Sequence, residues 1–126
     1  MATPAIIREG FAYRNGPRSM RNLTPRPDKD VSSEPGKAGL SAFQALEDAI
    51  KLGARGQKID LAKLAHPLAA FLEDDGHIGI VPVKSDGSID VTLLQQWADT
   101  RNVDSPHPLA VILDQAIVEA DIRRSR

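Results

Sequence analysis

The sequence predicts a protein of the α+β class, with a small antiparallel sheet and about three helices packed on it. The chain of 126 residues is long enough for one real core. Two apolar runs, 68–72 and 77–83, flank a turn over 73–76 that ends in Asp-Gly, a strong hairpin signal. Two later segments, 91–101 and 108–120, carry apolar residues at helical spacing.

The front of the chain is predicted to be a short strand followed by a long loop. Residues 10–15 read as a strand that a Gly-Pro pair closes. Because side chains alternate along a strand, Phe11 and Tyr13 share one side and Arg14 points to the other. Residues 17–39 are rich in proline, serine and charge, and their prolines exclude a long helix.

We therefore expect one domain over residues 1–126, with 17–39 as a long Pro-rich loop and 123–126 as a basic tail. Charge is unevenly spread, since residues 1–40 hold seven basic and four acidic side chains, and residues 41–122 hold six basic and thirteen acidic ones. A basic front beside an acidic body can steer a phosphate-bearing ligand. Solvated charge on a loop is the simpler interpretation.

A helix is predicted after the loop. Ser41 is placed to cap a helix that starts at Ala42, and Gln44 completes a capping-box pattern three residues later. Gly53 is a natural end for this helix. Gly39 leaves room for close backbone approach just before it.

Shorter signals fill in the rest of the chain. Lys58-Ile59 is predicted to be a brief strand, after which Asp60 caps a single turn over 61–64. Asp90 is a cap for the helix that follows, and Pro108 suits the first turn of the last helix.

Several classes of chemistry are excluded. The chain has no cysteine, which rules out disulfides and thiolate catalysis. It has no apolar run of the length of a membrane span, and no basic-then-apolar order of a cleaved signal peptide, so a cytoplasmic protein is the expectation. It also lacks a phosphate-binding loop with lysine, a nucleophile elbow and a zinc-like ligand set.

The histidines do not suggest a metal site, because the spacing of His66, His77 and His107 gives them no common face. His77 opens a strand directly after the acidic turn. The simpler interpretation pairs it with Asp74 or Asp75. The functional interpretation makes it a hydrogen-bonding group at the mouth of a cleft.

Arg14 and Ser41 each have two interpretations. Arg14 is either a surface arginine paired with an acidic neighbour or a guanidinium that clamps a diphosphate. Ser41 is primarily a helix cap, and its hydroxyl serves a ligand only if the helix start faces a pocket. It has no base beside it in the sequence, so we do not predict a nucleophile.

Four segments occur in a recognisable order: Tyr13-Arg14, Gly39–Phe43 with the pattern Gly-x-Ser-x-Phe, the stretch 59–68, and His77–Pro82 with the pattern His-x-x-Ile-x-Pro. This order resembles the small bacterial toxins with an ADP-ribosyltransferase-like fold, in particular type VI secretion effectors. The resemblance spans roughly residues 11–83.

The resemblance implies that NAD is the substrate, and the spacing of the histidines leads us to expect no metal. By position, Arg14 would hold the NAD phosphates or ribose, and Ser41 would sit beside the nicotinamide pocket. His77 would occupy the third motif, which makes Arg14, Ser41 and His77 the expected catalytic residues. Tyr13 and Phe43 would join Arg14 and Ser41 in binding the dinucleotide.

Two functions from different classes follow. The first is a bacterial toxin that acts on NAD in the cytoplasm, by ADP-ribosyl transfer or NAD hydrolysis, with an antitoxin or immunity protein as its partner. The second is a non-catalytic interaction protein (an antitoxin, immunity or phage accessory protein) that binds through 17–39 and its apolar helices. The acidic body and the few interleaved aromatics disfavour nucleic acid as a partner.

Overall fold

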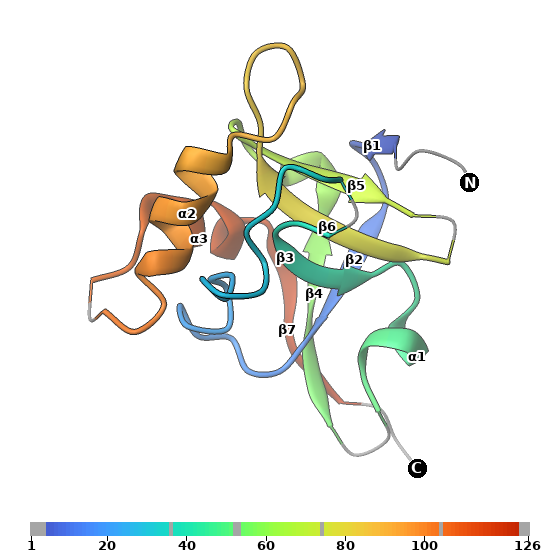
Figure 1. Cartoon of the computed structure of the whole chain (residues 1–126). Helices are drawn as coiled ribbons and strands as arrows, with labels where there is room; N and C mark the ends of the chain where they lie inside the picture. The colour runs from blue at the N-terminus through green and yellow to red at the C-terminus, as the bar shows by residue number, and fades with distance from the viewer. Residues whose placement is uncertain (1–4, 36, 52–53, 74, 104, 124–126) are drawn as a thin grey trace.

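The computed structural model describes residues 5–35, 37–51, 54–73, 75–103 and 105–123. It is an α+β fold, a seven-stranded antiparallel sheet with three α-helices and one 3-10 turn (Figure 1). The predicted class is confirmed, although the sheet is larger than the small one expected. In the described part of the chain, every helix is too short to cross a membrane.

The elements follow one another as β1 (Ala5–Ile7), β2 (Phe11–Asn15), β3 (Leu40–Phe43), α1 (Leu46–Ala49), β4 (Arg55–Asp60), η1 (Leu61–Lys63), β5 (Leu68–Leu72), β6 (His77–Pro82), α2 (Val91–Asp99), α3 (Pro108–Gln115) and β7 (Ile117–Arg123). Their order across the sheet is β1-β5-β6-β3-β2-β4-β7, with all neighbours antiparallel.

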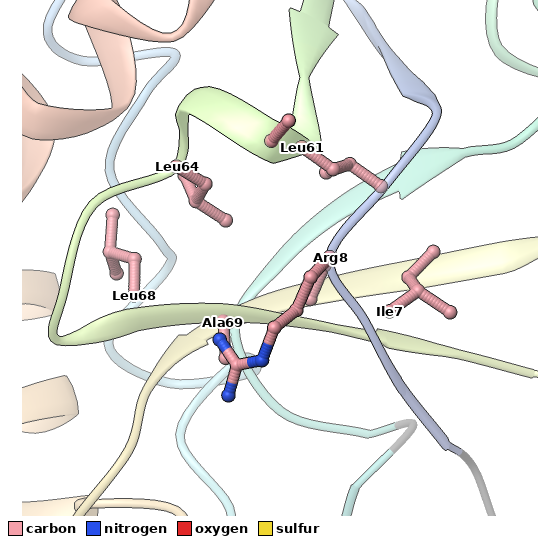
Figure 2. A pocket seen from close by; sticks show the side chains of 8 residues that line it. Ile7, Arg8, Leu61, Leu64, Leu68 and Ala69 are labelled. Carbon is pink, nitrogen blue, oxygen red and sulfur yellow. The ribbon is translucent and has the colours of Figure 1, made fainter.

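The sheet has to curl. β1 and β2 stand four places apart in the sheet, yet only residues 8–10 join them along the chain. Four strand spacings in a flat sheet would amount to about 19 Å, whereas the four Cα steps from Ile7 to Phe11 reach at most about 14 Å. The strong curvature of the strands in Figure 1 resolves this conflict. A small open pocket lies between β1, η1 and β5 (Figure 2).

The core lies on one face of the curled sheet. Leu40, Ile59, Ile78 and Ile80 are fully buried. The pairs Leu40↔Ile80 and Ala42↔Ile78 place β3 and β6 side chains on this same face. The helices add further fully buried side chains to the core: Leu94, Trp97 and Leu113.

The described residues of the Pro-rich segment 17–39 form no helix or strand, and two of them belong to the core. Leu23 is completely buried, and Thr24 is only 2% exposed. The Thr24 hydroxyl donates to the Met20 carbonyl, and Arg101 of the segment after α2 donates to the Thr24 carbonyl at 2.7 Å. The loop is therefore held by packing and by hydrogen bonds at its turns.

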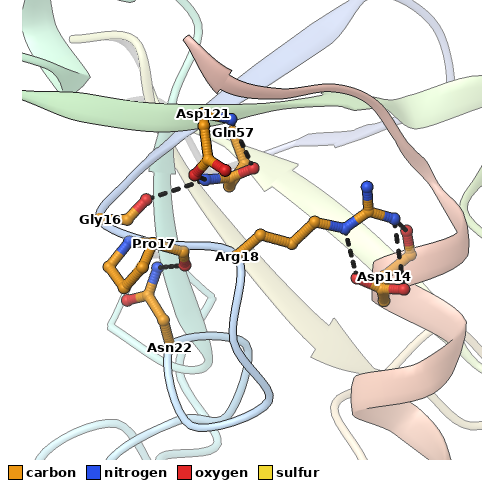
Figure 3. Close-up of polar contacts among 7 residues, drawn as sticks. All are labelled: Gly16, Pro17, Arg18, Asn22, Gln57, Asp114 and Asp121. Atoms are coloured by element: carbon orange, nitrogen blue, oxygen red, sulfur yellow. Dashed lines mark hydrogen bonds and ion pairs between the residues drawn. The ribbon is translucent and has the colours of Figure 1, made fainter. Parts of the chain in front are cut away.

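Polar contacts fasten the start of this loop to the C-terminal elements (Figure 3). Arg18 forms an ion pair with Asp114 of α3, with 2.8 Å between Nε and Oδ1. The completely buried Gln57 donates from Nε2 to the Gly16 carbonyl and to Asp121 of β7, both at 3.0 Å. These contacts link the residues that directly follow β2 to β4, α3 and β7.

The predicted helix from Ala42 to Gly53 is wrong. Residues 40–43 form β3, with β6 on one side and β2 on the other, and the helix is confined to Leu46–Ala49. A capping box contributes about 1 kcal/mol, which is less than the ladder hydrogen bonds and core burial that a central strand gains. Ser41 therefore does not cap a helix. The predicted end at Gly53 lies outside the described residues.

The predicted last helix is too long. It ends at Gln115, and Ile117–Arg123 forms the edge strand β7 against β4. The register between these strands shifts twice, on either side of Lys58. Beyond Ile117 most of β7 is exposed, and Asp121 has a positive φ of 53°. The brief strand expected at Lys58-Ile59 is likewise longer, and covers Arg55–Asp60.

Three other predictions from local turns and caps are confirmed. β5 and β6 form the expected hairpin, and Gly76 has the positive φ of such a turn. Asp60 Oδ1 accepts from the Ala62 N–H at the start of η1. Asp90 Oδ1 accepts from the Leu93 N–H at the start of α2.

Gly39 allows the close backbone approach that we expected at this position, here between the chain at residue 39 and β6. Its φ is +85°, and a Cβ built there would overlap the backbone carbonyl of Ile80 and the side chain of Val81. Gly10 has a nearly identical φ of +87° but open space around it. Substitutions at these two glycines therefore distinguish the cost of backbone strain, which both would have, from the cost of a steric clash, which only Gly39 would have.

We expect Gly39→Ala to lower the free energy of unfolding by about 3 kcal/mol, because it adds overpacking to left-handed strain. Gly10→Ala should cost about 1 kcal/mol, from strain alone. Urea unfolding of the two variants measures the difference. Equal costs would contradict a close contact between residue 39 and β6.

His107 caps α3 with a ring nitrogen. Its Nδ1 accepts from the Leu109 N–H at 3.1 Å, which requires an unprotonated Nδ1. Burial lowers the pKa of His107 below its usual value of 6.5. A histidine with a lowered pKa in the folded state contributes its full stability above about pH 6.5 and loses it as the pH falls through the folded pKa.

We expect His107→Asn to keep the cap through its side-chain oxygen and to reduce the loss of stability between about pH 7 and about pH 5. His107→Ala should cost about 1 kcal/mol at neutral pH, because the cap is lost. Urea unfolding at both pH values checks this. If His107→Asn kept the full acid sensitivity of the parent protein, another group would be responsible.

Candidate active site

Four of the predicted site residues share one face of the sheet, the face opposite the core side chains of β3. Phe43 of β3 stands opposite Tyr13 on β2 and opposite His77 on β6. Ser41 lies two residues before Phe43 and therefore points to the same side. Three strands that are far apart along the chain thus bring Tyr13, Ser41, Phe43 and His77 onto one surface.

Within this group, three side chains form a hydrogen-bonded relay. Ser41 Oγ lies 2.7 Å from His77 Nε2, and His77 Nδ1 lies 3.0 Å from Glu73 Oε2. If Nδ1 carries the proton and donates to the Glu73 carboxylate, then Nε2 accepts from the Ser41 hydroxyl. A carboxylate that orients a histidine beside a hydroxyl is an arrangement suited to proton transfer.

The relay is partly exposed to solvent, and its side chains are held by several contacts. The side chains of His77 and Glu73 are 22% and 29% exposed. The Phe43 ring meets the His77 ring edge-on, with 5.4 Å between their centroids. The His77 backbone N–H also donates to Asp75 Oδ1 at 3.0 Å. The imidazole is therefore held by a carboxylate, a hydroxyl and an aromatic ring.

Glu73 is the residue that the sequence analysis missed. The imidazole was expected to pair with Asp74 or Asp75, but its ring contacts Glu73, and Asp74 lies outside the described residues. Glu73 and His77 face one another where the hairpin turn begins and ends, since the Glu73 N–H donates to the His77 carbonyl. The sequence did contain a signal for this pair, because Glu73 is an acidic residue four positions before His77, on the other side of an Asp-Gly turn.

Arg14 lies on the other side of the sheet. It follows Tyr13 directly, so its side chain leaves β2 on the core face. Its Nη1 donates to the Ser41 carbonyl at 2.8 Å, while Nε and Nη2 donate to Asn22 O and Oδ1, each at 3.2 Å. Burial, followed by the nearby charge of Arg101, lowers the pKa of Arg14 to about 10.

Arg14 therefore touches the backbone of Ser41 rather than the hydroxyl. At neutral pH it remains charged, and its three donor atoms are engaged by the loop and by β3. These hydrogen bonds hold β3, the strand that carries Ser41, from the core side of the sheet. The structure brings Ser41 and His77 into contact and keeps the guanidinium of Arg14 apart from both side chains.

The other two histidines lie elsewhere. His66 is exposed before Pro67, and His107 serves as the cap of α3. Across the ranges that the structure describes, no group of three or more acidic or histidine side chains is placed to hold a metal ion.

Comparisons with protein-family models, with curated proteins and with solved structures found no match for this chain. The geometry of the Ser41–His77–Glu73 relay is therefore the basis for a functional argument.

We expect Arg14→Lys to lower the free energy of unfolding by about 2 kcal/mol, because an ammonium group cannot reproduce the forked contacts to Asn22 and Ser41. Arg21→Lys, on an exposed part of the same loop, is the matched control and should change stability little. Denaturant unfolding measures both. An Arg14→Lys variant as stable as the parent would show that these contacts are dispensable.

Proposed function

We propose that this chain is an NAD-directed enzyme that breaks the bond between nicotinamide and ribose, with Ser41, His77 and Glu73 as its acid–base cluster. The observation that supports the proposal most is the contact between Ser41 and His77, two expected site residues that are 36 positions apart. The resemblance to toxins with an ADP-ribosyltransferase-like fold supplies the substrate, and we include that fold in the proposal.

In this proposal His77 is the general base. Its Nε2 takes the proton of the Ser41 hydroxyl while that hydroxyl takes the proton of the attacking oxygen, which belongs to water or to a hydroxyl of a target. The ribose carbon forms a bond to that oxygen as its bond to nicotinamide breaks, and the bonding electron pair moves to the nicotinamide nitrogen. With water, the products are ADP-ribose, nicotinamide and a proton.

The neighbouring residues have separate roles. Glu73 is a positioning residue that keeps the Nδ1 proton in place and stabilises the charged imidazole. Ser41 hydrogen-bonds the catalytic nitrogen and orients the attacking group. Tyr13 and Phe43 offer ring surface beside the relay for the flat nicotinamide. Arg14 supports β3 from the core side, in place of the phosphate contact expected of it.

We expect His77→Ala to lower the rate of nicotinamide release from NAD at least about a hundredfold, because general base catalysis is worth that much. Ser41→Ala should lose activity by a similar factor, and Glu73→Gln by about tenfold, since the base remains but is less well oriented. The measurement is nicotinamide production by the purified full chain, followed by chromatography.

Two matched controls accompany these variants. Ser105→Ala and Glu119→Gln change exposed residues outside the relay and should keep the parent rate. Circular dichroism and unfolding curves confirm that each variant is folded. A parent protein without NAD turnover, or relay variants as active as these controls, would refute the proposal.

The second function, a non-catalytic interaction protein, gives the opposite results. It predicts no NAD turnover and no growth arrest on expression, whereas an NAD-consuming toxin should arrest its host unless a partner is co-expressed. One detail of the binding mode changes with the structure. Because Leu23 and Thr24 are buried, a partner would have to contact the exposed residues of 17–39, such as 26–29, instead of these two.

A further inference from the structure

The Ser41–His77–Glu73 relay has the connectivity of the triad in serine hydrolases. Ser41 Oγ lies 2.7 Å from His77 Nε2, and His77 Nδ1 lies 3.0 Å from Glu73 Oε2, so one ring nitrogen faces a hydroxyl and the other faces a carboxylate. This constellation recurs on unrelated folds and is identified by its geometry and by the role of each group. The sequence offers Ser41 no neighbouring base, but the pairing of β3 with β6 brings one to it.

The Ser41 hydroxyl is held where the imidazole can act on it. Arg14 Nη1 donates to the Ser41 carbonyl at 2.8 Å from the core side of β3. The Phe43 ring meets the His77 ring edge-on, and Glu73 fixes that ring through its other nitrogen. A nucleophile and a base that are already in position lose little freedom during the reaction, which lowers the barrier to attack.

The surroundings of the relay favour an ester with an aromatic alcohol part. Ser41 and His77 are partly exposed, and the Tyr13 and Phe43 side chains belong to the same face of the sheet. Aromatic rings offer a surface against which a further ring can pack. Because a phenolate is a good leaving group, an aryl ester also requires less stabilisation of developing charge than an amide does.

We propose that Ser41 is a covalent nucleophile and that the chain hydrolyses small aryl esters through an acyl-serine. The Ser41 oxygen forms a bond to the ester carbonyl carbon while its proton passes to His77 Nε2. The bond from that carbon to the phenolic oxygen then breaks, and the phenolate leaves with the electron pair and takes the proton from Nε2. Water next attacks the acyl group and gives its proton to Nε2, and the Ser41 oxygen takes this proton as the acid is released.

This activity rests on the relay and is independent of the cleavage of NAD. In the proposed function the Ser41 hydroxyl only passes a proton, whereas here its oxygen forms the bond to the substrate. Acylation and NAD turnover are measured separately. A chain that consumes NAD without being acylated would lose only the nucleophile, and a chain that is acylated but leaves NAD intact would lose only the proposed function.

The test is the reaction of the full chain with p-nitrophenyl acetate, in which absorbance follows nitrophenolate and peptide mass spectrometry locates the acetyl group. A fluorophosphonate ester, which bonds stably to an activated serine, traps the same oxygen. We expect both reagents to modify Ser41, and neither to modify this segment in Ser41→Ala. His77→Ala should slow the modification about a hundredfold, and added imidazole should restore part of the rate. Ser105→Ala, at an exposed serine outside the relay, is the matched control and should keep the parent rate.

A second pair of variants tests the base without an ester. The chain has no cysteine, so Ser41→Cys and Ser105→Cys each carry a single thiol. We expect iodoacetamide to alkylate the thiol of Ser41→Cys about tenfold faster than that of Ser105→Cys at neutral pH, because a neighbouring histidine favours the reactive thiolate. This order is opposite to that of exposure, since residue 105 is the more exposed of the two. Adding His77→Ala to Ser41→Cys should remove the advantage.

An acyl group on Ser41 whose formation depends on His77, together with the faster thiol, supports the nucleophile. Circular dichroism confirms that each variant is folded. Four results would overturn the proposal: no covalent adduct, an acyl group on another residue such as Tyr13 or His77 itself, unchanged modification in folded His77→Ala, or a Ser41→Cys thiol no faster than the control thiol.

Discussion

The insertion of β3 between β2 and β6 is the constraint on which both the core and the candidate active site depend. Leu40 and Ala42 on one side of this strand are buried, while Ser41 and Phe43 on the other side belong to the relay surface. Strand alternation makes these two roles inseparable. A one-residue slip of β3 would move Ser41 into the core and a leucine towards His77, so native packing and the relay form together.

The two halves of the relay differ in how they are assembled. Glu73 and His77 are four residues apart, and the turn of one hairpin brings them together. Ser41 reaches His77 only through long-range pairing, and Arg14 ties that strand to Asn22 in the long loop. The loop is thus part of the support of the site, although it contributes no side chain to the relay surface.

Features set by neighbouring residues could be predicted from the sequence. The caps at Asp60 and Asp90 and the β5–β6 hairpin each depend on a few adjacent residues. The capping-box pattern at Ser41 was equally local but was outweighed by pairing with strands far away in the chain. The choice of Glu73 over its acidic neighbours depended on turn geometry, which composition does not reveal.

The irregular edge strand β7 affects whether the sheets of two copies of this protein can pair along their edges. An open sheet exposes unpaired backbone groups along its border, and a straight border invites another chain to continue the sheet. Two register shifts, the left-handed backbone at Asp121, and charges at Glu119, Asp121 and Arg123 interrupt this border. These irregularities and charges make the free edge of β7 a poor template for the addition of another chain.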